Sequence, residues 1–242
     1  MLATIIKDHT SGDAYLNLAC PVCGCLPVPY VKHGRYFIDR CPDCGFVYVR
    51  NVPAEKSRVA ALGAATGGVA ARPRTSGRLF RNLENWLHTK SVARYAQGCR
   101  RLLQIDDGEG SPLSALRTAE KFELDHRAGI ASVKSATLSI AHGNLFDQRY
   151  PGDHFDFAVG IHVLDRVHHP GEFIREVRRV LSAHGRVYFV VQRSTYIKPP
   201  ERLWIFSVPA LQEFFAYHGF RVIFVRGRSI RAHLSVLAEK LP

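Results

Sequence analysis

The sequence has no uninterrupted apolar stretch of the roughly 18–20 residues that a membrane-spanning helix needs. Its first residues, MLATIIKDHTSGD, also lack the long apolar core and cleavage site of a secretory signal, so we expect a cytoplasmic protein without a membrane span. Acidic side chains are scarce, since 21 Asp and Glu stand against 33 Lys and Arg and give a formal net charge of +12. Hydrophobic residues nevertheless make up 46% of the chain, which is typical of a globular protein and excludes wholesale disorder.

The shortage of acidic residues is most marked between Asn51 and Arg101. This segment holds ten Lys and Arg residues but only Glu55 and Glu84 as acids. Such a segment attracts nucleic acid or other polyanions, which makes residues 72–101 a candidate nucleic-acid contact. A solvated basic helix face has the same composition, and no binding motif of interleaved aromatic and basic residues accompanies the charge.

The chain divides into three regions. Residues 1–50 are rich in cysteine and contain short β-like runs. Residues 51–100 form a basic linker with a helical part, and the glycine pair at 67–68 and Pro73 argue against one long helix. Residues 101–242 alternate between strand and helix patterns, as expected for a parallel sheet with right-handed crossovers.

The pattern of residues 101–242 predicts seven strands, the last two joined by a short connection as an antiparallel hairpin. A helix over 170–181 has one apolar face and Pro170 near its start, and a second helix over 207–218 has Ser207 as its N-cap and Gly219 at its end. A short helix is also expected over 111–119. The predicted strands cover residues 101–105, 121–125, 136–144, 155–164, 185–191, 220–226 and 232–240.

Two CxxCG units form the strongest local motif. Cys20 and Cys23 are separated from Cys41 and Cys44 by 17 intervening residues. Four thiolates at this spacing can hold one tetrahedral Zn²⁺, and the glycine after each pair allows the tight turn around the sulfurs. A site with four cysteines has no open coordination position, so we expect a structural zinc in a small ribbon-like module. Cys25 is an additional thiol that could exchange with one of the four.

The first predicted strand of the α/β region is followed by the loop Asp106–Gly110, which contains Gly108 and Gly110. The next strand ends in Asp125, and an acid at this position can accept hydrogen bonds from the two hydroxyls of a ribose. Parallel sheets bind ligands at the carboxyl ends of their strands, near the change in strand order. The pattern therefore predicts a nucleotide-type cofactor at this edge.

These residues give the chain a resemblance to class I S-adenosylmethionine (SAM) methyltransferases, in particular bacterial members with a four-cysteine N-terminal region. The stretch REVRRVL at 175–181, followed by Gly185, is the most specific match, and FDFAV at 155–159 resembles the family's fourth strand. The resemblance implies a Rossmann-like sheet of seven mostly parallel strands with a closing antiparallel hairpin. It also implies SAM as the cofactor and methyl transfer to an O, N or C acceptor as the reaction.

The resemblance assigns cofactor binding to eight residues along the strand ends. It places Asn144 against the adenine, whereas Gln104 and Asp106 stand where the family usually has Asp and Gly, so the loop departs from the family pattern. The assigned residues are Gln104, Asp106, Gly108, Gly110, Asp125, Asn144, Leu145 and His162.

Alignment of donor and acceptor accounts for most of such a reaction, and a general base assists when the acceptor carries a proton. Candidate catalytic residues are His162, Asp165 and His168, of which His162 directly follows the buried run of 155–161. Two alternatives remain open: a methyltransferase-like binding or assembly protein without catalysis, and a basic zinc-containing protein that binds nucleic acid.

Overall fold

The computed structural model describes eleven parts of the chain. These are residues 4–7, 14–17, 19–53, 88–106, 120–125, 133–134, 137–192, 197, 199, 202–228 and 233–242. The predicted helix over 111–119, most of the linker, and Gly108 and Gly110 lie outside them. No helix among the described residues is long and apolar enough to cross a membrane.

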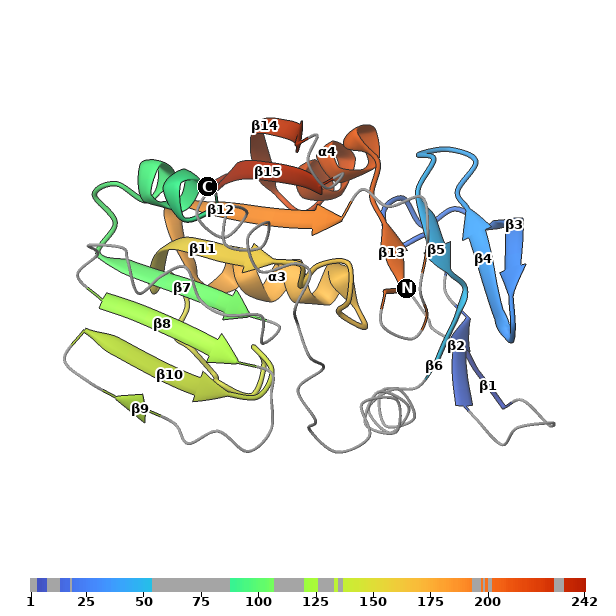
Figure 1. Ribbon diagram of the computed structural model, residues 1–242, viewed down its shortest axis with the longest axis horizontal. Helices are drawn as coiled ribbons and strands as arrows, with labels where there is room; N and C mark the ends of the chain where they lie inside the picture. The colour runs from blue at the N-terminus through green and yellow to red at the C-terminus, as the bar shows by residue number, and fades with distance from the viewer. Residues whose placement is uncertain are drawn as a thin grey trace, which may run out of the picture.

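The main element is a twisted sheet whose strands run in the order β14-β15-β12-β11-β7-β8-β10-β9 (Figure 1). Seven of these strands correspond to the seven predicted ones, and the two-residue strand β9 extends the sheet at one edge. Their bounds are β7 Arg101–Asp106, β8 Glu120–Asp125, β9 Val133–Lys134, β10 Leu138–His142, β11 Phe155–Ile161, β12 Leu181–Gln192, β14 Phe220–Arg228 and β15 His233–Lys240.

The five strands β10, β8, β7, β11 and β12 are parallel, and β14 and β15 form the antiparallel hairpin at the other end. The mixed, mostly parallel Rossmann-like sheet predicted from the sequence is therefore confirmed. The chain moves outward from β7 through β8 to β10 and then returns to the opposite side of β7 to form β11. This change of direction lies between β7 and β11, where parallel sheets of this kind bind their ligands.

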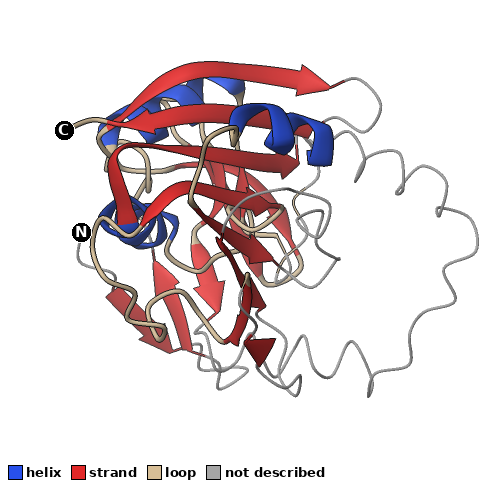
Figure 2. Cartoon of the chain, turned by 90° about the vertical axis from the view of Figure 1, so that its left-hand side faces the viewer, coloured by secondary structure: helices blue, strands red, loops and turns tan. Residues whose placement is uncertain are grey.

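Both faces of the sheet are covered, as Figure 2 shows for the helices. Residues 88–95 are helical, and Val92 and Ala96 pack with Leu102 and Phe157 on one face. Helices α3 (Pro170–Val180) and α4 (Val208–Tyr217) contribute buried side chains to the cluster that also contains Ile105. This burial explains why β11 reads as a continuous apolar run.

Both predicted helices are present with nearly the expected limits. Ser207 caps α4, since its hydroxyl accepts a hydrogen bond from the Ala210 N–H at 3.2 Å, and Gly219 follows the helix with a φ of +78°. Helix α3 ends one residue earlier than predicted because Leu181 adopts extended backbone angles and begins β12 directly.

Two smaller sheets lie beside the main one, on the right of Figure 1. The first contains β3 (Val28–His33), β4 (Tyr36–Arg40), β5 (Val47–Val49) and β13 (Trp204–Ile205), and the second contains β1 (Thr4–Lys7), β2 (Ala14–Asn17) and β6 (Asn51–Pro53). Strand β13 comes from the α/β region of the chain, yet it pairs with β5. The cysteine-rich region thus completes its sheet with a strand from far along the sequence.

Aromatic rings hold these two parts together. Trp204 is fully buried, its ring lies 6.3 Å from that of Phe46, and its indole N–H donates to the Val167 carbonyl at 2.6 Å. One continuous cluster of buried side chains extends from Cys20 and Cys41 to the main sheet.

Candidate functional site

The four cysteines of the two CxxCG units lie together. Their Sγ atoms are all within 4.8 Å of one another, with Cys20 and Cys44 3.6 Å apart and Cys23 and Cys41 3.4 Å apart. Four sulfurs placed about 2.3 Å from one zinc ion would be separated by about 3.8 Å, so the donor set and spacing fit tetrahedral zinc.

The local backbone explains the convergence of the cysteines. Gly24 and Gly45 have φ values of +77° and +69°, a conformation that residues with a Cβ adopt at a cost. The Gly24 N–H donates to the Cys20 carbonyl at 2.8 Å, and the Gly45 N–H donates to the Cys41 carbonyl at 3.1 Å. Each turn therefore folds one CxxC pair around a common point.

Cys25 lies beside this cluster rather than away from it. Its Sγ is 2.9 Å from the Sγ of Cys41, and it is half-buried. The position keeps Cys25 available as an alternative ligand, whereas Cys99 packs with the apolar residues on the far face of the main sheet.

The carboxyl edge, defined here as the end of the main sheet where β7, β8, β10, β11 and β12 finish, gathers most of the predicted cofactor residues. Asp106 and Asp125 are the last residues of β7 and β8 and are paired in register. Asn144 follows β10, and His162 follows β11 directly. Topology therefore brings together polar residues that span more than a fifth of the sequence.

Three of these residues have defined side-chain environments. Gln104 is 3% exposed within β7, and Leu145 is 1% exposed in the core. The Asn144 Oδ1 accepts a hydrogen bond from the Asp147 N–H at 3.0 Å, so the oxygen stabilises the local turn. The Asn144 Nδ2 is then the group with which this side chain can donate to an adenine nitrogen.

His162 occupies an unusual position. Its φ is +57°, which few residues other than glycine adopt, and its N–H donates to the Val190 carbonyl at 2.8 Å. The imidazole packs edge-to-face on His233, with 4.6 Å between ring centroids. Burial, followed by the nearby His233, His88 and two arginines, holds the pKa of His162 well below its usual range, so the ring is uncharged at neutral pH.

The other two catalytic candidates already have partners. Asp165 is fully buried, its Oδ2 lies 3.1 Å from the Arg202 Nε, and burial raises its pKa while Arg202 opposes that rise. Arg202 also donates to the Gln192 side-chain oxygen. The His168 Nδ1 lies 3.0 Å from the His169 Nε2, just before helix α3. These contacts favour a structural rather than a catalytic role for Asp165 and His168.

Two further histidines lie at this edge, and no sequence pattern marks either of them as a site residue. His233 begins β15 opposite Gln192, the last residue of β12, and His88 lies in the helix over 88–95, with 6.3 Å between the two ring centroids. Both side chains are less than 10% exposed. Only the antiparallel pairing of β15 with β12 brings His233 to the carboxyl edge.

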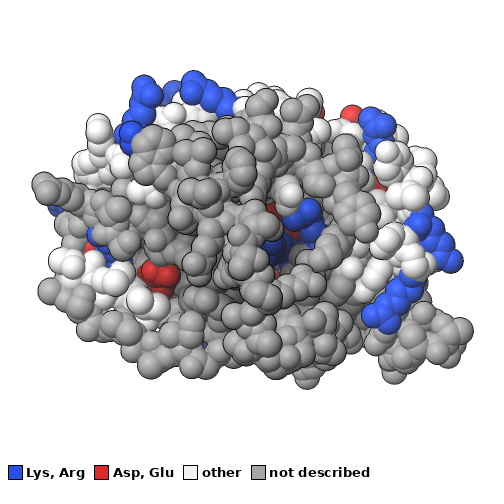
Figure 3. Space-filling view, in the orientation of Figure 1, with Lys and Arg blue, Asp and Glu red and all other residues white. Residues whose placement is uncertain are grey.

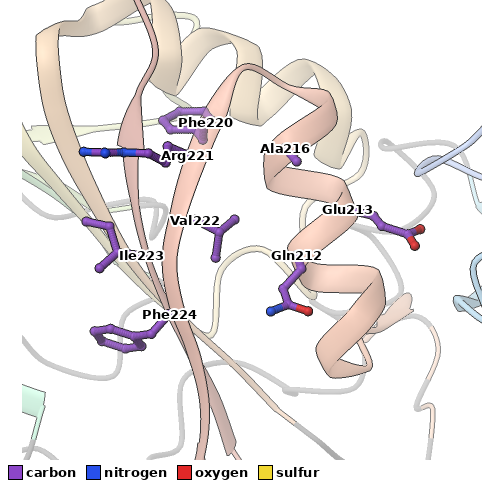
Figure 4. A pocket seen from close by; sticks show the side chains of 8 residues that line it. All are labelled: Gln212, Glu213, Ala216, Phe220, Arg221, Val222, Ile223 and Phe224. Atoms are coloured by element: carbon purple, nitrogen blue, oxygen red, sulfur yellow. The ribbon is translucent and has the colours of Figure 1, made fainter.

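A separate groove of about 410 Å³ lies between α4 and β14 (Figure 4). Gln212, Glu213 and Ala216 line it from α4, and Phe220 to Phe224 line it from β14. This part of β14 pairs with the end of β15 and lies level with Arg186–Tyr188 of β12, whereas Gln192 at the carboxyl edge pairs with His233. The groove is therefore remote from the carboxyl edge.

Basic side chains gather over β3 and β4 at the right-hand edge of Figure 3. Lys32, Arg35 and Arg40 are exposed there. The described part of the basic segment also exposes Lys90, Arg94 and Arg100. A contact between residues 72–101 and nucleic acid remains a prediction.

Comparison with known proteins finds similar folds and one family that matches part of the chain. A family described as a methyltransferase domain matches residues 92–189, and no curated protein matches the sequence. A Burkholderia thailandensis 1,6-didemethyltoxoflavin-N1-methyltransferase, solved with 1,6-didemethyltoxoflavin and S-adenosylhomocysteine, has a TM-score of 0.62 at 14% identity, over 88% of this chain and 99% of its own.

Other solved structures share the fold. A SAM-dependent methyltransferase from Mesorhizobium loti has a TM-score of 0.53 at 14% identity, over 64% of this chain and 97% of its own. The [4+2]-cyclase SpnF has a TM-score of 0.55 at 17% identity, over 66% of this chain and 82% of its own. The domain match covers residues 92–189 and these neighbours show that the chain shares their fold, while the cyclase shows that the same fold also carries other chemistry.

Proposed function

We propose that this protein transfers a methyl group from SAM to an acceptor bound at the carboxyl edge of the main sheet. The observation that carries the proposal is the convergence of Asp125, Asn144 and His162 at the strand ends beside the change in strand order. When bound, SAM supplies a methyl group on a sulfonium, which is already an activated leaving group. The protein then has mainly to bind, align and, where needed, remove a proton.

Each residue has a proposed task. Asp125 accepts hydrogen bonds from the ribose hydroxyls, and the Asn144 amide faces the adenine. Gly108 and Gly110, which lie outside the described residues, and Asp106, the last residue of β7, are proposed to contact the methionine part of SAM. His162 meets the acceptor, while Asp165 fixes Arg202 and His168 supports the start of helix α3.

The zinc site is proposed as structural. Cys20, Cys23, Cys41 and Cys44 would use all four positions of a tetrahedral ion and leave none for a substrate. The ion would hold the turns that carry β3, β4 and β5 against Trp204.

Calorimetric titration of the zinc-loaded protein with SAM and S-adenosylhomocysteine tests the proposal. We expect binding of both, and Asp125→Ala should weaken it about ten- to a hundredfold because a hydrogen bond to an ionised acceptor contributes about 1.5–3 kcal/mol. Glu120→Gln, at the opposite end of the same strand, is the matched control and should bind normally. A folded protein that binds neither ligand would instead support the alternative of a methyltransferase-like protein without catalysis.

A further inference from the structure

Three histidines from distant parts of the chain meet at the carboxyl edge. His162 follows β11, His233 begins β15, and His88 lies in the helix over 88–95. The ring centroids of His162 and His233 are 4.6 Å apart at an interplanar angle of 65°, and those of His88 and His233 are 6.3 Å apart. We call these three residues the histidine cluster.

The position of His162 has two energetic costs. A side chain with a Cβ is strained at a φ of +57°. The buried Nδ1 of its ring also has no hydrogen-bond partner among the described residues, and such an atom is costly in a protein interior. Backbone strain and an unsatisfied buried nitrogen in one residue, at the edge where this fold binds ligands, point to a functional role.

The charges around His162 favour an uncharged ring. His233 lies on β15, His88 on the neighbouring helix, Arg166 on the turn after β11 and Arg202 before β13, and each of them disfavours the imidazolium. Among the described residues, the Arg202 guanidinium is itself paired with the Asp165 carboxylate. His162 is thus a neutral imidazole in positive surroundings.

We propose that the histidine cluster is the methyl-acceptor site, that it takes an acceptor with an acidic O–H or ring N–H, and that His162 removes this proton while His233 positions the His162 ring. The proposal rests on the proposed function. A lone pair of the acceptor oxygen or nitrogen forms the bond to the methyl carbon. The carbon–sulfur bond breaks with its electrons left on sulfur, giving S-adenosylhomocysteine, and the acceptor proton passes to the His162 ring.

The surroundings of the base determine the acceptor class. An imidazole whose protonated form is disfavoured is a weak base, so it removes a proton efficiently only from an acidic group. The nearby Arg166 and Arg202 favour the negative charge that develops on such an acceptor. A phenol or a ring N–H meets both conditions, whereas an aliphatic alcohol does not.

Binding of para-nitrophenol to protein saturated with S-adenosylhomocysteine tests the acceptor class, because the absorbance of this phenol reports its ionisation. Para-nitrobenzyl alcohol has a similar shape without the acidic hydroxyl and serves as the matched ligand. We expect the phenol to bind about tenfold or more tightly than the alcohol, since only the phenol can give its proton to the site. Equal binding of the two probes, or no binding of the phenol, would overturn the proposal.

Three variants locate the effect. His162→Asn keeps a residue type that tolerates positive φ and should abolish the preference for the phenol. His184→Asn is the control, because His184 also has a positive φ, of +60°, but is exposed and lies near the start of β12. His233→Phe keeps a ring against His162, and the pH midpoint of phenol binding should move upward because the neighbouring imidazole no longer disfavours protonation of His162.

The outcomes separate this proposal from the proposed function. A phenol preference that persists in His162→Asn, or a midpoint that is unchanged in His233→Phe, contradicts the acceptor site even if SAM binds. Absence of SAM binding together with a phenol preference that depends on His162 contradicts methyl transfer but retains the acceptor site.

Discussion

The cysteine cluster and the carboxyl edge are assembled in opposite ways. The four thiols come from two short turns separated by 17 residues, and each turn is encoded by its own CxxCG unit. The polar groups of the carboxyl edge come from the ends of five strands and from a helix that precedes them all. Local spacing therefore specifies the first site, whereas strand order specifies the second.

The largest expected effect is at the cysteine cluster. Cys41→Ser should remove the metal and unfold residues 19–53, because a structural zinc contributes roughly 10–16 kcal/mol to a small module. Metal analysis measures the zinc content, and the thermal midpoint measures the loss of stability. Cys99→Ser is the control, since Cys99 packs in the other apolar cluster. Full zinc content in the Cys41 variant would show that Cys25 or another residue takes its place.

The difference between local and topological assembly also explains what could be predicted. Each described helix and strand of the main sheet except the two-residue β9 was predictable, since its apolar period and its caps, such as Ser207, lie within or beside the element. The pairing of β13 with β5 was not, because it joins residues more than 150 positions apart and Trp204 gives no local sign of its partner.

The same argument applies to the candidate site. Asp125 and His162 could be proposed from the sequence because Asp125 ends a predicted strand and His162 directly follows the buried run of 155–161, and their roles stay predictions. His88 and His233 were missed because a histidine at the start of an antiparallel strand, or in a basic helix, has no pattern that indicates a site. The contact of Asp165 with Arg202 depends on a chain segment 37 residues away.

The next largest effect concerns the junction of the two regions. Trp204→Ala should destabilise the protein by about 3–5 kcal/mol, the usual cost of removing a large buried aromatic side chain, and it also removes the hydrogen bond to the Val167 carbonyl. Urea unfolding and the rate of zinc release to a chelator should both change, because one apolar core serves both regions. Phe146→Ala, at a side chain that is 48% exposed, is the control. Normal zinc release from the Trp204 variant would indicate two independent units.

A smaller effect is expected from acid. Burial, with Arg175 nearby, lowers the pKa of His218 to about 4. The unfolded chain has the ordinary pKa of about 6.5 and so binds more protons between these values, which means that stability is full above pH 6.5 and declines towards pH 4. After allowance for solvent screening the loss is about 1–2 kcal/mol.

Thermal midpoints measured against pH test this expectation at a site remote from both the thiols and the carboxyl edge. His218→Gln should flatten the decline in this window, and His184→Gln, whose side chain is 69% exposed, should leave it unchanged. An identical pH profile in wild type and His218→Gln would show that His218 does not cause the decline.

The smallest expected effect concerns a surface ion pair at the end of the main sheet opposite the carboxyl edge. Arg221 and Glu239 form an ion pair at 3.0 Å near the amino ends of the parallel strands, with the Arg221 side chain 65% exposed. Exposed pairs contribute about 0–1 kcal/mol, so Arg221→Ala should lower stability by no more than this and leave SAM affinity unchanged. Removal of the charge of Asp125 at the carboxyl edge should instead weaken SAM binding about ten- to a hundredfold. Calorimetry on both variants compares the loss of a charge at opposite ends of one sheet. A comparable loss of affinity in Arg221→Ala would mean that the overall charge of the protein, rather than the placement of its strand ends, determines cofactor binding.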